Sequence, residues 1–137
     1  MSELSMWNAI RPVIKSLDPY RVENFIVPGM PDVNYSNGWI ELKYMERWPP
    51  RNGPLRVDHF TPQQRVWLYQ RCRVGGLAWL LLKVGKDEWL LFRGDVASVR
   101  LGYSTREELY QACTARWTRL PEMGEICQYL LMEKTRN

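Results

Sequence analysis

Histidine and cysteine are scarce in this sequence, and their scarcity excludes the usual zinc sites. The 137 residues include one histidine, His59, and three cysteines, none of which belongs to a CxxC pair. A structural zinc site takes four Cys or His ligands at short spacings, which this chain cannot assemble. We therefore expect Cys72, Cys113 and Cys127 to be reduced thiols that are mostly buried.

Long apolar runs are also missing. The most apolar stretch, GLAWLLLKV at 76–84, is far too short to cross a bilayer. The first residues, MSELSMWNAIRP, lack the basic segment followed by an apolar one that marks a secretory signal. We therefore expect a soluble cytoplasmic protein without a membrane partner.

The composition is that of an ordinary globular protein. Apolar residues make up 45% of the chain and charged residues 25%, which is typical of a folded domain. We expect one domain over residues 1–137, large enough to bury a core. The net charge of +4 favours a polyanionic partner, although charge alone is weak support for one.

The order of the predicted elements indicates an α/β domain. Asn37-Gly38 is a strong hairpin signal, Thr61 and Pro62 suit the start of a helix, and Gly75-Gly76 would end that helix. A helix between two strands predicts a crossover, and therefore a mixed central β-sheet flanked by helices. The predicted elements are a helix to about residue 16 with Pro12 inside it, an extended segment at 20–27, a hairpin at 31–44, an irregular loop at 45–60, a helix at 61–74, strands at 77–84 and 88–94, and helices at 105–117 and 121–133.

The hairpin carries ionisable groups on one of its faces. With Asn37-Gly38 as a two-residue loop, Asp32 lies opposite Lys43 and diagonal to Glu41, at Cβ separations of about 5 and 7–8 Å. One divalent cation fits between two carboxylates at that separation. The alternative is an exposed ion pair between Asp32 and Lys43, which would contribute only about 0–1 kcal/mol. The other face is apolar and belongs to the core: Val33, Tyr35, Ile40, Leu42 and Tyr44.

These residues also follow a known pattern. Pro31-Asp32 and Glu41-Leu42-Lys43, followed by a helix that begins Thr61-Pro62-Gln63-Gln64, resemble the PD-(D/E)xK nuclease superfamily. Within it the chain is similar to the VRR-NUC and Holliday-junction-resolvase branch, many of whose members are phage-encoded. The resemblance covers residues 1 to about 93 and implies a restriction-endonuclease-like core. Residues 94–137, which we expect to be helical, lie outside it.

The resemblance implies roles for the residues of the motif. Asp32 and Glu41 would bind Mg2+, with Mn2+ as a substitute, and the backbone carbonyl of Leu42 is the natural third ligand. Lys43 would sit beside the attacking water, and hydrolysis would leave a 5′-phosphate. Related enzymes add another acid; we favour Glu23 over Glu3, because Glu3 is near a terminus that would fray.

The glutamine-bearing helix and the loop before it supply the remaining candidates. Gln64 matches the family's catalytic glutamine, but it is also the third residue of a Thr61 capping box, and the two roles compete. Gln63 is the alternative if the register differs by one residue. Arginines in the Pro-rich loop would contact phosphates and Trp48 would contact bases, or the loop is merely solvated with Trp48 packed on the core. The predicted DNA-binding residues are Arg47, Trp48, Arg51 and Arg56; His59 would cap or line the same loop.

The predicted function is that of a Mg2+-dependent endodeoxyribonuclease acting on branched DNA such as Holliday junctions, in DNA recombination and repair. Symmetric cutting of a junction needs two active sites, so we expect a homodimer. Two alternatives stay open: a duplex or nicking endonuclease with sequence preference, and a catalytically inactive nucleic-acid-binding module on the same fold.

Overall fold

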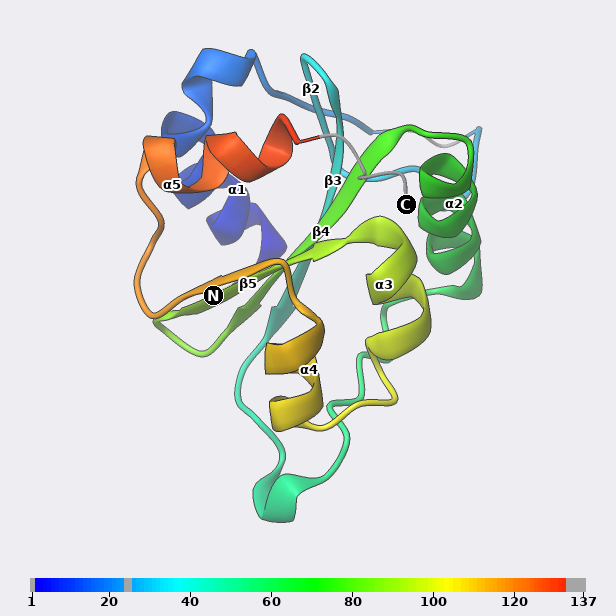
Figure 1. Cartoon of the computed structure of the whole chain (residues 1–137), viewed down its shortest axis with the longest axis vertical. Helices are drawn as coiled ribbons and strands as arrows, with labels where there is room; N and C mark the ends of the chain where they lie inside the picture. Colours follow the sequence, from blue (N-terminus) through cyan, green and yellow to red (C-terminus); the bar gives the residue numbers. More distant parts are fainter. Residues whose placement is uncertain (1, 24–25, 133–137) are drawn as a thin grey trace.

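The computed structural model describes residues 2–23 and 26–132 of the chain, and a mixed six-stranded sheet runs through its centre. The strands follow one another in the sheet in sequence order, and helices cover both of its faces (Figure 1). The predicted fold class, an α/β domain with a mixed sheet flanked by helices, is confirmed. The elements are α1 (Glu3–Val13), a 3-10 turn (Lys15–Leu17), β1 (Tyr20–Arg21), β2 (Val33–Tyr35), β3 (Gly38–Met45), a second 3-10 turn (Pro50–Asn52), α2 (Pro62–Arg73), β4 (Leu77–Val84), β5 (Glu88–Arg93), α3 (Gly94–Arg100), α4 (Arg106–Ala112), β6 (Ala115–Trp117) and α5 (Met123–Leu130).

The centre of the sheet is the parallel pair β3 and β4. The two strands pair over their full length, and α2 makes the crossover between them, as predicted. All other neighbouring strands are antiparallel. Every residue of β4 is buried, which is what a strand covered on both faces requires.

Two separate cores lie on the two faces of the sheet. One core packs α1 and α5 against the sheet through Trp7, Ile10, Ile126 and Leu130. The other core packs α2, α3 and α4 against the opposite face, and Figure 1 shows this division. Of the three cysteines, all are free thiols, and two of them are buried. No helix among the described residues has the length and apolar character that crossing a membrane requires.

The hairpin turns one residue earlier than predicted. Tyr35 pairs with Gly38, so the loop consists of Ser36 and Asn37, and Gly38 is the first residue of β3. The reason lies in the neighbouring strand, because a Cβ atom at Gly38 would lie 2.2 Å from the carbonyl oxygen of Leu77. The close approach of β3 to β4 therefore requires this glycine, and the turn does not.

The shifted turn changes cross-strand partners but not faces. Moving the turn by one residue shifts every partner by two positions, so each side chain stays on its predicted side. Continuing the observed register by one pair places Asp32 opposite Glu41, and the predicted opposition of Asp32 and Lys43 is wrong. The apolar face is confirmed, with these residues in the α1-side core: Val33, Tyr35, Ile40, Leu42 and, partly buried, Tyr44.

Two further segments differ from the prediction. The extended segment predicted at 20–27 contains a strand only at Tyr20–Arg21, and residues 24–25 lie outside the described residues. The helix predicted at 105–117 ends at Ala112, and residues 115–117 form β6, which adds to the sheet beside β5. The part after residue 93 is therefore not purely helical. A strand of three residues is too short for its alternation to be recognised in the sequence.

Candidate active site

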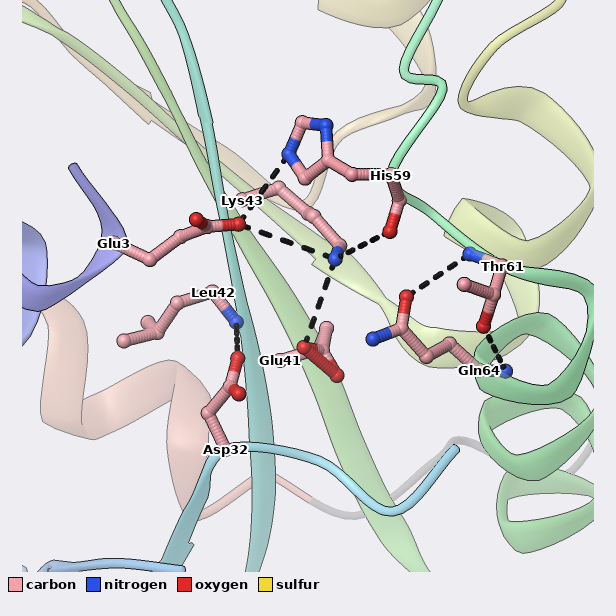
Figure 2. Close-up of polar contacts among 8 residues, drawn as sticks. All are labelled: Glu3, Asp32, Glu41, Leu42, Lys43, His59, Thr61 and Gln64. Atoms are coloured by element: carbon pink, nitrogen blue, oxygen red, sulfur yellow. Dashed lines mark hydrogen bonds and ion pairs between the residues drawn. The ribbon is translucent and has the colours of Figure 1, made fainter. Parts of the chain in front are cut away.

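Strand β3 places an acid and an amine on the α2 side of the sheet. Side chains alternate along a strand, so Leu42 enters the α1-side core while Glu41 and Lys43 point to the opposite face. Both are almost fully buried, with 1% and 3% of their surface exposed. This burial excludes the exposed ion pair that was the alternative for the hairpin. Figure 2 shows the two side chains among residues from α1, the segment just before β2, the loop before α2, and the first turn of α2.

Asp32 lies at the free edge of β3, just before β2 begins. Its Oδ2 accepts a hydrogen bond from the backbone N–H of Leu42 at 3.0 Å. Backbone pairing between β2 and β3 stops at Val33 and Ile40. The Asp32 carboxylate therefore takes the place of a backbone acceptor for the next exposed N–H of β3. The N–H and C=O of one strand residue point to the same side, so the Leu42 carbonyl faces the same edge as Asp32.

The bend before Asp32 is fixed by a close backbone contact. Gly29 has a φ of +86°, in the left-handed region that favours glycine. A Cβ atom there would lie 2.3 Å from the carbonyl oxygen of Gln63. The bend therefore rests directly on the first turn of α2, and this contact holds Asp32 near that helix.

The Glu41 carboxyl has an unusual proton affinity. Its pKa is raised from 4.5 to about 10, mainly by burial and also by the neighbouring Asp32 and Glu3 carboxyls, which together outweigh the opposite effect of Lys43. In addition, Glu41 Oε2 is buried without a hydrogen-bond partner among the described residues. A buried polar atom without a partner costs free energy, so a protein keeps one only where something else compensates.

Lys43 is the positive centre of the site. Its Nζ donates a hydrogen bond to the backbone carbonyl of His59 at 3.0 Å. Carboxylate oxygens of Glu41 and Glu3 lie 3.9 and 4.0 Å from the same nitrogen. The aromatic ring of Phe60 lies on another side, with its centroid 5.8 Å away. The ammonium is therefore held in one position by groups from β3, α1 and the loop before α2.

The structure brings Glu3, and not Glu23, to this cluster. Helix α1 begins at Glu3 because Ser2 caps it, and Met6 and Trp7 anchor its first turns in the core. Glu3 Oε1 lies 3.3 Å from the His59 ring nitrogen Nε2 as well as near Lys43. Glu23 is exposed, and within the described part of the chain no ion pair joins it to the cluster.

His59 is a member of the site that sequence reasoning did not assign to it. It was predicted only to cap or line the loop, yet its carbonyl holds Lys43 and its ring contacts Glu3. Its position two residues before the Thr61 cap is the one local signal, and that signal concerns helix geometry alone. No motif in the sequence indicates that this loop folds over β3.

Gln64 performs the capping role that competed with its predicted catalytic role. The Thr61 N–H donates to Gln64 Oε1 at 3.0 Å, and the Gln64 N–H donates to Thr61 Oγ1 at 3.2 Å, which is a complete capping box. In Figure 2 the amide nitrogen of the same side chain is turned toward Glu41. The capping box uses the Gln64 Oε1 atom, so the Gln64 Nε2 amide remains on the side that faces Glu41. Gln63 is exposed.

The donor set suits a hard cation that retains water. Asp32 and Glu41 supply two carboxylates at the edge that the Leu42 carbonyl also faces, and Glu41 Oε2 lacks another partner. In the described ranges no group of three or more His, Cys, Asp and Glu side chains is arranged to hold a metal ion. Two carboxylates with water and a carbonyl match the preference of Mg2+ and do not match that of zinc.

The Pro-rich loop after β3 places its predicted DNA-binding residues in two different environments. Arg47, Arg51 and Arg56 are exposed. Trp48 is partly buried, packs on the α2-side core, and donates its indole N–H to Glu88 at 2.8 Å. Trp48 packs on the core, which was the alternative to its predicted contact with bases. The three arginines remain accessible to a ligand.

Comparison with known proteins identifies the fold. No family model matches the sequence, and no curated protein matches it. The structure is similar to that of Hjc, a Holliday junction resolvase from the archaeal hyperthermophile Archaeoglobus fulgidus, with a TM-score of 0.53 and 19% sequence identity over 81% of this chain and 90% of that one. At this identity the likeness shows the fold, which is the resolvase-type, restriction-endonuclease-like α/β fold.

Proposed function

We propose that this protein is a metal-dependent DNA endonuclease that hydrolyses phosphodiester bonds in branched DNA such as Holliday junctions. The observation that carries the proposal is the buried Glu41 carboxyl with an unpartnered oxygen, set beside Asp32 and Lys43. These residues occupy a fold shared with a Holliday junction resolvase. The PD-(D/E)xK resemblance supports the assignment, and membership of the VRR-NUC branch is part of the proposal.

Asp32, Glu41 and the Leu42 carbonyl would hold Mg2+, or Mn2+ in its place. When bound there, the cation supplies positive charge that activates a water molecule and offsets charge on the phosphoryl group. Asp32 is already aligned by the Leu42 N–H. Glu41 must give up its proton to become a ligand, because burial keeps its carboxyl neutral otherwise.

Lys43 would orient the attacking water and a phosphoryl oxygen. An ammonium carries three donors, and the His59 carbonyl uses one of them at 3.0 Å. Glu41 and Glu3 lie near 4 Å, beyond hydrogen-bond distance. Donors therefore remain for the reacting groups, while the carbonyl and the two acids keep the ammonium in place. Glu3 and His59 act as positioning residues in this scheme.

Branched DNA as the substrate, and a homodimer as the active form, rest on the neighbour's activity and on symmetry. Paired cuts in a junction require two active sites, which a two-fold dimer supplies. The net charge of +4 and the exposed arginines of the Pro-rich loop favour a polyanion. Arg47, Arg51 and Arg56 are the residues we expect to contact DNA phosphates beside the site.

A gel assay with a four-way junction and a linear duplex of matched sequence tests both levels of the proposal. Wild-type protein with Mg2+ should cleave the junction, and Asp32→Ala should bind it without cleaving. Glu107→Gln, which removes an exposed acid from α4, is the control and should cleave as wild type does. Equal cleavage of both DNAs would contradict the preference for branches, and cleavage by Asp32→Ala would contradict the site. Binding without cleavage by the wild-type protein would identify the inactive binding module.

A further inference from the structure

A cleft of about 480 Å³ lies at the far end of β3 from the hairpin turn, outside the site described above. Its walls come from the loop after β3, the turn between β4 and β5, and the segment from α4 to the end of β6. Residues of the last third of the chain, to which the sequence assigned no role, thus meet the Pro-rich loop here. The residues that carry its chemistry are Arg47, Trp48, Glu88, Arg106, Tyr110 and Arg116.

Glu88 holds several of the side chains that line the cleft. The carboxylate accepts hydrogen bonds from the Trp48 indole at 2.8 Å, the Arg106 guanidinium at 3.1 Å and the Tyr110 hydroxyl at 2.5 Å. Arg116 Nη1 lies 3.8 Å from Glu88 Oε2, the oxygen that accepts from Tyr110. Glu88 is largely buried, and its one negative charge is shared among several donors. The carboxylate therefore fixes two arginines without cancelling both of their charges.

The two guanidinium groups are held in place and still face solvent. Arg116 lies over the Tyr110 ring with its Cζ 3.9 Å from the centroid, and Arg106 lies over the Trp48 ring at 5.2 Å. Arg106 Nε also donates to the Tyr110 hydroxyl. Nevertheless the side chains of Arg106 and Arg116 remain 47% and 41% exposed. Arginines held by rings lose little further entropy on binding an anion.

The chemistry of the lining selects the class of ligand. The ring faces carry guanidinium groups, so they are poor platforms for a stacked base. The cations of the cleft are Arg47, Lys86, Arg106 and Arg116, against the acids Glu46, Asp87 and Glu88. Of these acids, Glu46 pairs with Arg47 at 3.7 Å on the exposed rim. The excess charge is positive, and arginine forks match phosphate oxygens.

We propose that this cleft binds a backbone phosphate of the DNA substrate through Arg106 and Arg116. The proposal rests on the proposed function, because it assumes that DNA is the substrate. Trp48 follows Lys43 by five positions in the chain, so their Cα atoms are at most about 18 Å apart. That distance corresponds to about five base pairs along a duplex. The cleft would therefore hold the arm of the substrate next to the cleaved bond.

The test is the salt dependence of DNA binding, measured by fluorescence anisotropy with a labelled duplex in the absence of divalent cations, where cleavage plays no part. Arg106→Gln/Arg116→Gln should lower the slope of log affinity against log salt by about 1–2, because about 0.9 is lost per phosphate contact. Its affinity should fall about tenfold or more. The control, Arg73→Gln/Arg100→Gln, removes equal charge from exposed helix positions and should keep the wild-type slope.

A second variant covers the case in which the double substitution impairs folding. Thr118→Glu adds a negative charge to the exposed lining of the cleft without removing any contact of Glu88, and it should also weaken DNA binding. Equal slopes for cleft and control variants, together with unchanged binding by Thr118→Glu, would overturn the proposal. Saturation of the cleft by inorganic phosphate in calorimetry, with equal slopes for DNA, would overturn it as well. If the protein binds DNA but does not cleave it, the proposed function is contradicted. The salt-dependence slopes still decide whether the cleft binds a phosphate, because they are measured without cleavage.

Discussion

Glu41→Gln is the substitution that separates a metal ligand from a structural acid. Because burial raises the Glu41 pKa to about 10, the carboxyl is neutral at pH 7 in the protein without metal. Glutamine has the same shape and is also neutral, so it should replace this group with little change in packing. We therefore expect the free energy of unfolding in EDTA to change by no more than about 1 kcal/mol near pH 5.

The same substitution should remove a pH dependence of stability. The folded pKa of Glu41 is raised far above its ordinary value of 4.5, so the folded state keeps a proton that the unfolded state releases. Stability is then greatest below pH 4.5 for this group and is lost as the pH rises toward 10, by roughly 1 kcal/mol per pH unit. Glu41→Gln should therefore be more stable than wild type in EDTA at pH 8.

Adding Mg2+ should offset most of that difference. A ligand present at a hundredfold excess over its dissociation constant stabilises the folded state by about 3 kcal/mol. For a chain of 137 residues this corresponds to a rise of roughly 9 °C in the melting temperature. Wild type should show this rise. Glu41→Gln should not, because the amide offers no negative charge to a hard cation.

Thermal unfolding followed by circular dichroism, at pH 5 and pH 8 with EDTA or Mg2+, measures all of these effects. Glu107→Gln is the matched control, since it makes the same chemical change at an exposed position. It should follow wild type in every condition. An equal rise in melting temperature with Mg2+ for wild type and Glu41→Gln would refute the metal site. A large loss of stability of Glu41→Gln in EDTA at pH 8 would show that the carboxylate is charged and needed by Lys43.

The remaining predictions concern the supports of the site. Glu3→Gln should reduce cleavage at least tenfold by loosening the buried ammonium, whereas Glu23→Gln should leave the rate unchanged; equal effects in single-turnover assays would contradict the placement of Glu3. Gly29→Ala should cost about 2–5 kcal/mol in chemical denaturation, through overlap added to backbone strain. Gly75→Ala, with φ +89° and open space around it, should cost only about 1–2 kcal/mol, and equal losses would exclude the overlap. Tyr35→Phe should cost about 2–4 kcal/mol, because a buried carbonyl and an indole lose their partner; denaturant midpoints equal to wild type would refute this.

The hairpin shows which part of the fold a sequence predicts and which part it does not. Alternation along the strands predicts the two faces correctly, because this property depends on each strand alone. The turn at Asn37-Gly38 was predicted from local turn chemistry, but the glycine serves the contact with Leu77 of β4. A contact between strands that are far apart in sequence has no local signal. The turn was therefore predicted one residue too late, and every cross-strand partner was shifted by two positions.

The candidate site shows the same division. Local rules predicted the capping box of Thr61 and Gln64, and the structure contains it. The structure places Glu3 in the cluster and not the favoured Glu23, because Ser2 caps α1 and the core anchors that helix, which the expectation of fraying near a terminus did not include. His59 joined the site through the path of its loop, which no periodicity describes.

The balance of charge in the cluster argues that it is more than a structural ion pair. Two acids, Glu3 and Glu41, have carboxylate oxygens 4.0 and 3.9 Å from one ammonium, that of Lys43, and Asp32 neighbours Glu41. A structural pair would need one acid, and further carboxyls close to the buried Glu41 cost stability unless they are compensated. The protein without metal compensates by keeping a proton on Glu41, which leaves an oxygen without a partner. A divalent cation would satisfy that oxygen and the excess negative charge together, as the proposed metal site requires.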